Sequence, residues 1–271
     1  MNTSDYLINN ALIGSTGFVG TTLSRQAIFG SFFRSGTISE IAGKKFDCVV
    51  CSAAPAQKWI ANREPDADLK NIEGLIAHLA QISCDSFVLI STVDVFKRPV
   101  HVKEDAGIDE DGLHAYGLHR RMLEKFVQSH FDNHLIVRLP GLVGPGLRKN
   151  VIFDFLNANH LNAIDCRSVF QFYPIVNLWY DIQIALKHNL RLVHLTAEPI
   201  SVEDVSKLGF NKPFDHMLPN PPVLYDMQTH YAELFCGMGP YQYNRRTSLQ
   251  AIRTYAQSEP HTQKREGAMS Q

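Results

Sequence analysis

Short apolar runs alternate with segments of helical periodicity over the first half of the chain. The apolar runs predict strands at residues 12–13, 31–34, 46–53, 87–90 and 135–139. Between them, residues 69–82 place apolar side chains at helical spacing, and residues 113–130 predict a further helix. Strands that alternate with helices are typical of a parallel sheet with crossover helices on both faces. The pattern therefore predicts an α/β fold with a doubly wound parallel sheet.

The regular alternation of predicted strands and helices ends after residue 147. Residues 151–158 and 179–187 have helical patterns, and residues 192–195 predict a strand that returns to the sheet. The proline-rich stretch 210–222 predicts an irregular loop. We expect a first portion over residues 1–147, a second over 148–256, and a polar, disordered tail at 257–271.

Composition narrows the classes of protein. Of 271 residues, 45% are hydrophobic and 20% charged, with a net charge of -1, so a large core is available but no concentrated basic face. This balance argues against a nucleic-acid partner. No run approaches the ~18 apolar residues that a membrane-spanning helix needs, so we expect no membrane partner either.

The cysteines and histidines predict neither a disulfide framework nor a metal site. The five cysteines are odd in number, which favours a reducing, cytoplasmic setting. Cys48 and Cys51 have C-x-x-C spacing but flank two valines, which favours a strand with buried thiols over a redox or metal site. The twelve histidines show no ligand spacing. We expect His114, His119 and His130 at the surface or at an interface.

The segment GSTGFVG, from Gly14 to Gly20, lies between the first predicted strand and a helix. Glycine permits the tight turn at Gly14, the close approach of a phosphate at Gly17 and close helix–sheet packing at Gly20. The following helix would point its free N–H groups at the anion. The motif therefore predicts a dinucleotide site, although its glycine spacing is one residue wider than G-x-G-x-x-G. Its predicted cofactor contacts are Gly14, Thr16, Gly17, Phe18, Val19 and Gly20.

The end of the second strand bears on cofactor choice. An acidic residue there is typical of NAD binding, whereas arginine suits the 2′-phosphate of NADP. Here Arg34 and Ser35 follow the strand, and no acid appears before Glu40. A guanidinium can bind phosphate through two hydrogen bonds. We therefore predict NADP in preference to NAD; the alternative is a surface arginine in a loop.

Candidate chemistry lies where strands end, because ligands of open α/β sheets bind beyond the carboxyl ends of the strands. The fourth strand ends in STVDVF, which begins at Ser91, and the fifth ends in RLPGLVGPG, which begins at Arg138. In the helix between them Tyr116 and Arg120 are four residues apart, so they share a face. A phenol has a pKa of ~10 and needs a nearby cation to exchange protons near neutral pH.

Taken in order, these motifs resemble the extended short-chain dehydrogenase/reductase family, which has a Rossmann-type fold and includes nucleotide-sugar epimerases, dehydratases and 4-keto reductases. The match is collinear over residues 12–146, and a weaker match follows at residues 175–186 and 194–205. It comprises GSTGFVG, CSAAP from Cys51, Asn71 within a helix, STVDVF, YGLHR followed by Glu124, and RLPGLVGPG.

The resemblance implies roles for individual residues. Tyr116 matches the catalytic tyrosine that gives or takes a proton during hydride transfer, and Thr92 matches the hydroxyl that binds the reacting oxygen. Arg120 stands where the family has a lysine that supplies charge and holds the nicotinamide ribose; arginine keeps the charge but differs in shape. The resemblance also implies a homodimer and a substrate-binding role for residues 148–256. Implied cofactor contacts are Ala53, Ala54, Leu139 and Pro140.

Residues that depart from the family's motifs narrow the range of reactions to expect. Val93 and Asp94 replace the Asp-Glu pair of the dehydratases, and the ending Val95-Phe96 is similar to the 4-keto reductases. Gly141 and Gln171 stand where substrate-binding residues are common in the family. The predicted substrate contacts are Trp59, Asp94 and Asn150. For Trp59 the alternative is ordinary packing, and for Asn150, together with Arg148 and Lys149, it is a loop that caps the next helix.

The sequence thus predicts an NAD(P)-dependent oxidoreductase or epimerase acting on a nucleotide-linked sugar, most specifically by 4-keto reduction or epimerisation. The alternative is a catalytically weak NADP-binding regulator or scaffold with the same fold.

Overall fold

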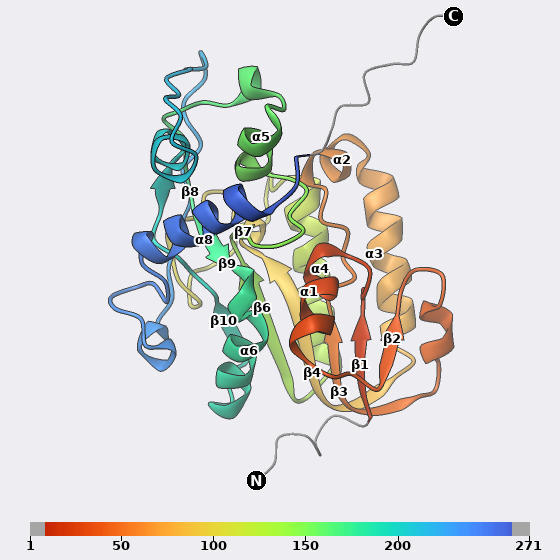
Figure 1. Cartoon of the computed structure of the whole chain (residues 1–271). Coiled ribbons are helices and arrows are strands. Elements are labelled where there is room, and N and C mark those ends of the chain that lie inside the picture. Colours follow the sequence, from red (N-terminus) through yellow and green to blue (C-terminus); the bar gives the residue numbers. More distant parts are fainter. Residues whose placement is uncertain (1–8, 262–271) are drawn as a thin grey trace, which may run out of the picture.

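A parallel sheet organises the computed structural model, which describes residues 9–261 (Figure 1). All neighbouring strands in it are parallel. In spatial order the strands are β10 (Leu192–His194), β6 (His134–Leu139), β4 (Ser83–Thr92), β3 (Lys45–Cys51), β1 (Asn10–Ile13) and β2 (Ser31–Phe33). The predicted strands all form, and the predicted return of residues 192–195 to the sheet is confirmed.

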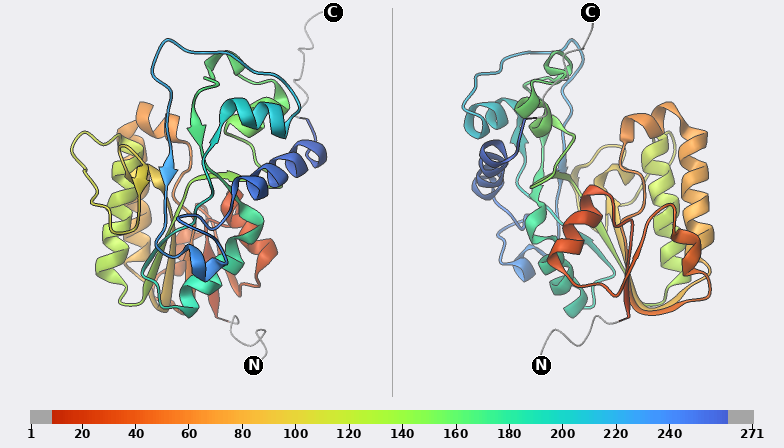
Figure 2. Two further views of the ribbon diagram at one scale, coloured as in Figure 1. Left: turned by 90° about the vertical axis from the view of Figure 1, so that its left-hand side faces the viewer. Right: turned by 45° about the vertical axis from the view of Figure 1, so that its right-hand side comes forward.

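Helices cover both faces of this sheet, so the predicted doubly wound α/β fold is confirmed. One face packs against α1 (Phe18–Gln26) and α6 (Leu178–Lys187), and the other against α3 (Pro65–Leu79) and α4 (Ala115–His130). The right-hand view of Figure 2 shows α3 and α4 side by side on their face. Alternate residues of each strand enter different cores: Leu12 and Val50 pack under α1 and α6, whereas Ile13 and Val49 pack under α3 and α4.

The chain reverses its direction of travel across the sheet at β1. It passes through α1 to β2 on one side of β1, and then returns to β3 on the other side. The return from β2 to β3 is short and carries only the 3-10 helix Ile38–Ile41. Such a reversal opens a crevice beyond the strand ends, and this is where open α/β sheets bind ligands.

A third core lies beyond the carboxyl ends of the strands. It combines α5 (Val151–Asn157) and α8 (Arg245–Ser258) with the π-helix Val205–Gly209. Residues 210–222 contain no helix or strand, as predicted for the proline-rich stretch. The remaining short elements are α2 (Lys58–Arg63), α7 (Val202–Asp204), β5 (Val100–Val102), β7 (Gly141–Val143), β8 (Val169–Phe170), β9 (Phe172–Pro174), β11 (Ile200–Ser201), β12 (Asp226–Met227), and 3-10 helices at Val93–Val95, Leu161–Ala163, Ile175–Asn177 and Ala232–Phe235.

Two expectations need correction. The predicted disordered tail at 257–271 is wrong at its start, because Gln257 and Ser258 belong to α8; residues 262–271 lie outside the described part of the chain. His119 is buried rather than exposed, because its Nδ1 lies 2.7 Å from an oxygen of Asp68 on α3. A pattern of apolar positions does not reveal a buried polar pair of this kind.

The strand interpretation of the C-x-x-C pair is confirmed. Cys48 and Cys51 lie in β3, the first half-buried and the second buried, and burial raises the pKa of each thiol to about 11. Within residues 9–261, no group of three His, Cys, Asp or Glu side chains is placed to hold a metal ion. Over the same range, every helix is too short or too polar to cross a membrane.

Candidate active site

The glycine turn after β1 has the geometry of an anion-binding cradle. Gly14 adopts φ +87°, and a Cβ atom there would lie 2.6 Å from the backbone of Ser52. A Cβ at Gly20 would lie 2.1 Å from the Gly14 carbonyl oxygen, so only glycine lets α1 begin this close to the strand. Gly17, at the start of α1, is exposed, and no side chain caps the helix. The free N–H groups of the first turn are therefore available to an anion.

The other predicted residues of this turn lie at the same edge. Thr16 is exposed in the turn, while Phe18 and Val19 open α1 and are half-buried. The end of β2 is tied to the turn by the Gly14 N–H, which donates to the Phe33 carbonyl at 2.8 Å. Arg34 and Ser35, which follow directly, are both exposed. The structure thus brings the predicted 2′-phosphate contacts to the glycine turn.

The ends of β3 and β6 complete a continuous strip beside the turn. The backbone of Ala53 lies against Gly14, within 2.7 Å of where a Cβ would stand, and Ala54 follows it. Leu139 pairs in register with Thr92 at the ends of β6 and β4, and Pro140 is buried directly after it. These positions lie at or just after the carboxyl ends of their strands, at the same edge of the sheet as the glycine turn.

Tyr116 reaches the end of β4 because α4 packs closely onto it. A Cβ at Gly117 would stand 2.1 Å from the Asp94 carbonyl oxygen, so glycine is needed for this approach. The His114 ring caps the helix by accepting the Gly117 N–H at 3.0 Å. As a result, Tyr116 lies near the end of β4, where Thr92 lowers the pKa of its phenol. The phenol is 8% exposed.

Arg120 lies over the face of Tyr116. Its guanidinium carbon is 4.0 Å from the centre of the phenol ring, and the side chain is 2% exposed. The guanidinium is paired with the Asp68 carboxylate and donates to the Pro55 carbonyl oxygen. Sequence reasoning missed Asp68, whose position in α3 carries no motif. Burial opposes ionisation of Asp68, but hydrogen bonds from Arg120 and His119 hold its pKa below the usual value.

The environment of Tyr116 favours its protonated form. Burial raises the pKa of the phenol to about 12, because the nearby Arg120 charge lowers it by less than burial raises it. The Asp94 carboxylate raises the pKa further, whereas the Thr92 hydroxyl lowers it. The phenol is therefore held as a proton donor over the neutral range.

A second cluster surrounds the Asp94 carboxylate. Lys58, on α2, places its Nζ 2.7 Å from Oδ1 of Asp94, and the Tyr225 hydroxyl donates to the same oxygen at 2.7 Å. The Lys58 ammonium also donates to the Tyr225 hydroxyl at 3.0 Å. Neither Lys58 nor Tyr225 was predicted. Lys58 carries a weak signal, because it follows the CSAAP segment closely, whereas Tyr225 carries none.

Comparison with solved structures identifies the fold. A dTDP-4-dehydrorhamnose reductase from Clostridium acetobutylicum superimposes with a TM-score of 0.71 at 16% identity, covering 91% of this chain and 97% of that one. RMD from Pseudomonas aeruginosa, complexed with NADPH, gives 0.69 at 16% identity, with 92% and 99% coverage. The Bordetella bronchiseptica enzyme WbmG, in complex with NAD, gives 0.70 at 14% identity, with 94% and 96% coverage.

The chain has the Rossmann-type fold of these solved structures. No family model matches its sequence, and no curated protein matches it. The likeness that the comparisons show therefore lies in the fold, at 14–16% sequence identity.

Of the predicted substrate contacts, Trp59 is exposed, whereas Asn150 has a structural role. Trp59 is 63% exposed on α2, with the Arg63 guanidinium carbon 4.7 Å from its ring centre, so the alternative of ordinary core packing is wrong. Asn150 caps α5 by accepting the Ile152 N–H at 2.9 Å, and its amide donates to the Leu142 carbonyl oxygen. Its side chain thus has the capping role that was the alternative.

Two further residues of this region make structural contacts. The Gln171 side chain is buried and bonds backbone groups of Ala197 and Met227, so it holds the second portion together. Lys149 donates to the Ala56 carbonyl oxygen and so joins the loop before α5 to the strip that follows β3. The Asp94 carboxylate is 15% exposed and has both oxygens within reach of protein partners.

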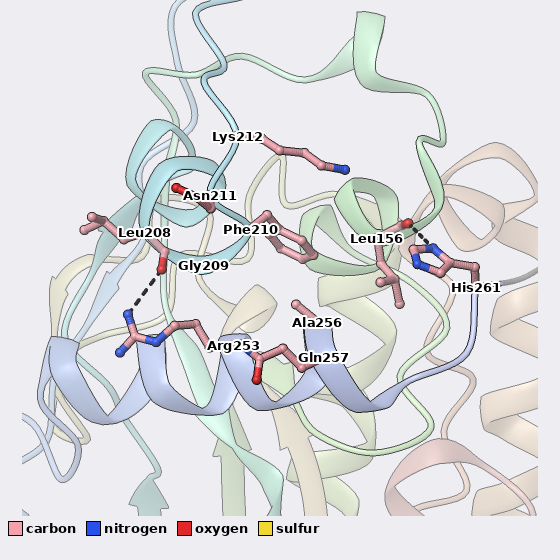
Figure 3. Close-up of a pocket in the computed structure, with 10 residues that line it drawn as sticks. All are labelled: Leu156, Leu208, Gly209, Phe210, Asn211, Lys212, Arg253, Ala256, Gln257 and His261. Carbon is pink, nitrogen blue, oxygen red and sulfur yellow. Dashed lines mark hydrogen bonds between the residues drawn. The ribbon is translucent and has the colours of Figure 1, made fainter.

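A pocket of about 320 Å³ lies away from these residues (Figure 3). It opens between α8, the end of α5 and the residues after the π-helix, with Phe210 and Leu156 on its walls. Arg253 and His261 use side-chain nitrogens to bind backbone carbonyls there. None of the predicted site residues lines this pocket.

Proposed function

We propose that the protein is an NAD(P)-dependent oxidoreductase or epimerase that acts on a nucleotide-linked sugar, most specifically by reduction or epimerisation at the 4-position. The observation that carries the proposal is the Tyr116 phenol beneath the Arg120 guanidinium, held by α4 against the end of β4 at the sheet edge that also bears the glycine turn. Support comes from structures of the same fold, which include a dTDP-4-dehydrorhamnose reductase and a UDP-galactose 4-epimerase.

The residues present fit a nicotinamide dinucleotide. The cradle at Gly14 and Gly20 has no room for side chains, and the first turn of α1 offers uncapped N–H groups for a pyrophosphate. When bound, the cofactor supplies or accepts the hydride. The residues that would hold it are Gly14, Thr16, Gly17, Phe18, Val19, Gly20, Arg34, Ser35, Ala53, Ala54, Leu139 and Pro140.

The protein's own groups handle the oxygen of the substrate. In reduction, the carbonyl carbon gains a hydride while Tyr116 donates its phenolic proton to the oxygen, and the reverse applies in oxidation. Thr92 donates a hydrogen bond to the same oxygen and positions it. Arg120, held over the ring by Asp68, stabilises the phenolate that remains.

A binding and turnover assay separates this proposal from its alternative. Purified protein is titrated with NADPH and NADH and then assayed against keto nucleotide sugars, while mass spectrometry searches for copurified ligands. Turnover supports the enzyme. Cofactor binding without turnover of any keto nucleotide sugar would favour the catalytically weak regulator or scaffold.

The preference for NADP over NAD is part of the proposal, and Arg34 is the residue that tests it. Arg34→Ala is expected to weaken NADPH binding about tenfold or more and to leave NADH binding nearly unchanged, because only the 2′-phosphate gains charge-assisted hydrogen bonds. Arg25→Ala, which removes another exposed arginine on α1, is the control and should change neither affinity. Equal losses for both cofactors would contradict the assignment.

A further inference from the structure

The loop before α5 brings a positive charge to the end of β4, where α4 holds Tyr116. We propose that the Lys149 ammonium is the cation that a ligand meets there, and that it binds a phosphate group of the nucleotide-linked substrate. The identity of this ligand rests on the proposed function, whereas the binding of a nucleoside diphosphate by Lys149 is measurable without any turnover.

The other cation at this edge, Arg120, offers no accessible donor to a ligand. Its Nη1 donates to Asp68 and to the Tyr116 carbonyl oxygen, and its Nη2 donates to Asp68 and to the Pro55 carbonyl oxygen. The remaining nitrogen, Nε, is buried and has no hydrogen-bond partner within residues 9–261. Arg120 is therefore not available for the ribose contact that the resemblance implies for a lysine at this position.

Lys149, by contrast, is exposed and reaches across the same edge of the sheet. Its Nζ donates to the carbonyl oxygen of Ala56, the residue after Pro55, whose own carbonyl accepts from Arg120. Ala56 follows β3 and Lys149 follows β6, and β4 lies between these two strands. The contact therefore joins the segments on either side of β4 and places the ammonium close to the end of that strand.

The charges around this point do not cancel. Asp68 pairs with Arg120, and Asp94 pairs with Lys58 at 2.7 Å, so each carboxylate already has its cation. Among the described residues Lys149 forms no ion pair, and its hydrogen-bond partner is a neutral carbonyl group. One positive charge is therefore in excess at the end of β4, and a bound anion would neutralise it.

A phosphate of the substrate is the anion that suits this position. An ammonium has three N–H donors, so Lys149 can keep the Ala56 carbonyl and donate to phosphate oxygens as well. The proposed phosphate contacts of the dinucleotide lie elsewhere along the sheet, at the glycine turn after β1 and at Arg34 after β2. The phosphate that remains for Lys149 is therefore that of the nucleotide-linked sugar.

Two neighbouring cations are less suited to this role. The Lys58 ammonium is held by the Asp94 carboxylate and by the Tyr225 hydroxyl, so its charge is already compensated. Arg148 is exposed one residue before Lys149 and forms no hydrogen bond or ion pair within the described chain. Because Arg148 has the same charge in the same loop but no contact with the strip that follows β3, it provides the matched control.

Binding of nucleoside diphosphates tests the assignment without turnover. UDP, dTDP, GDP and CDP are titrated into the protein by calorimetry in the presence of saturating NADPH, so that the dinucleotide site is occupied, and the corresponding nucleosides serve as uncharged probes. Lys149→Met keeps the length of the side chain and removes its charge, and Arg148→Met removes a charge one residue earlier. Both positions are exposed, so both variants should fold, and urea midpoints of unfolding verify this.

We expect at least one diphosphate to bind the wild type, and Lys149→Met to weaken its binding about tenfold or more, because charge-assisted hydrogen bonds to the phosphate are lost. Lys149→Arg, which keeps the charge, should recover most of this affinity, and Arg148→Met should bind as the wild type does. The affinity for the uncharged nucleoside and the affinity for NADPH should be the same in Lys149→Met as in the wild type.

Three results would overturn the assignment: no nucleoside diphosphate binds the wild type, Arg148→Met loses as much affinity as Lys149→Met, or Lys149→Met weakens NADPH binding and leaves diphosphate binding intact. Failure of the proposed function is distinguishable, because it would appear as absent turnover with Lys149-dependent diphosphate binding intact. Where turnover occurs, Lys149→Met should raise KM about tenfold and leave kcat nearly unchanged, because the phosphate contact is equal in the ground and transition states.

Discussion

Tyr116→Phe is expected to lower turnover about a thousandfold and to leave NADPH affinity unchanged. The substitution removes the only group on the phenol that can donate a proton, while the ring keeps its burial and its contact with the Arg120 guanidinium at 4.0 Å. Folding should therefore be preserved. The measurements are kcat with a keto nucleotide sugar, the NADPH dissociation constant, and the urea midpoint of unfolding.

Tyr180→Phe provides the matched control for this experiment. Tyr180 is 66% exposed on α6, on the other face of the sheet, and loses the same hydroxyl without a role in the site. All three measured quantities should match the wild type. A Tyr116→Phe protein that turns over as fast as the wild type would remove Tyr116 from the reaction.

Gly20→Ala is expected to destabilise the protein by about 3 kcal/mol and to abolish tight NADPH binding, because the added methyl group must displace backbone. Its Cβ would stand 2.1 Å from the carbonyl oxygen of Gly14, where α1 leaves the turn. Gly17→Ala should behave differently. Its Cβ meets nothing nearer than 3.6 Å, so the fold should be retained while the methyl group obstructs the phosphate approach and weakens binding.

The glycine substitutions have a matched control, and one outcome would contradict the cradle assignment. Gly74→Ala, in the middle of α3 with open space around it, should leave NADPH affinity unchanged and raise stability by about 0.5–1 kcal/mol. Denaturation midpoints and NADPH titrations give both quantities for each variant. Wild-type NADPH affinity in Gly17→Ala would show that the cradle does not bind the pyrophosphate.

The sequence was sufficient to predict the features that depend on the local pattern of residues. Apolar runs located the strands within a few residues, and the glycine turn was placed correctly because its spacing reflects backbone constraints that no other residue meets. The position of Tyr116 near the end of β4 was also predictable. Parallel strands end at one edge, and the helix after β4 passes over that edge.

Features that depend on the packing of distant segments were not predictable. Asp68 pairs with Arg120 because α3 packs against α4, and nothing in the periodicity of α3 distinguishes this aspartate from its exposed neighbours. The prediction that His119 lies at the surface or at an interface was wrong for the same reason. Tyr225 reaches Asp94 from a segment without regular structure, so its position follows only from the complete fold.

Transfer of deuterium tests the central claim most directly. The protein is incubated with a keto nucleotide sugar and with NADPH that carries deuterium at the transferable position of the nicotinamide, and the product is examined by mass spectrometry and NMR. We predict that the label appears on the former carbonyl carbon of the sugar, and that Tyr116→Phe suppresses its appearance. Wild-type protein that binds labelled NADPH and leaves every keto nucleotide sugar unlabelled would contradict the account.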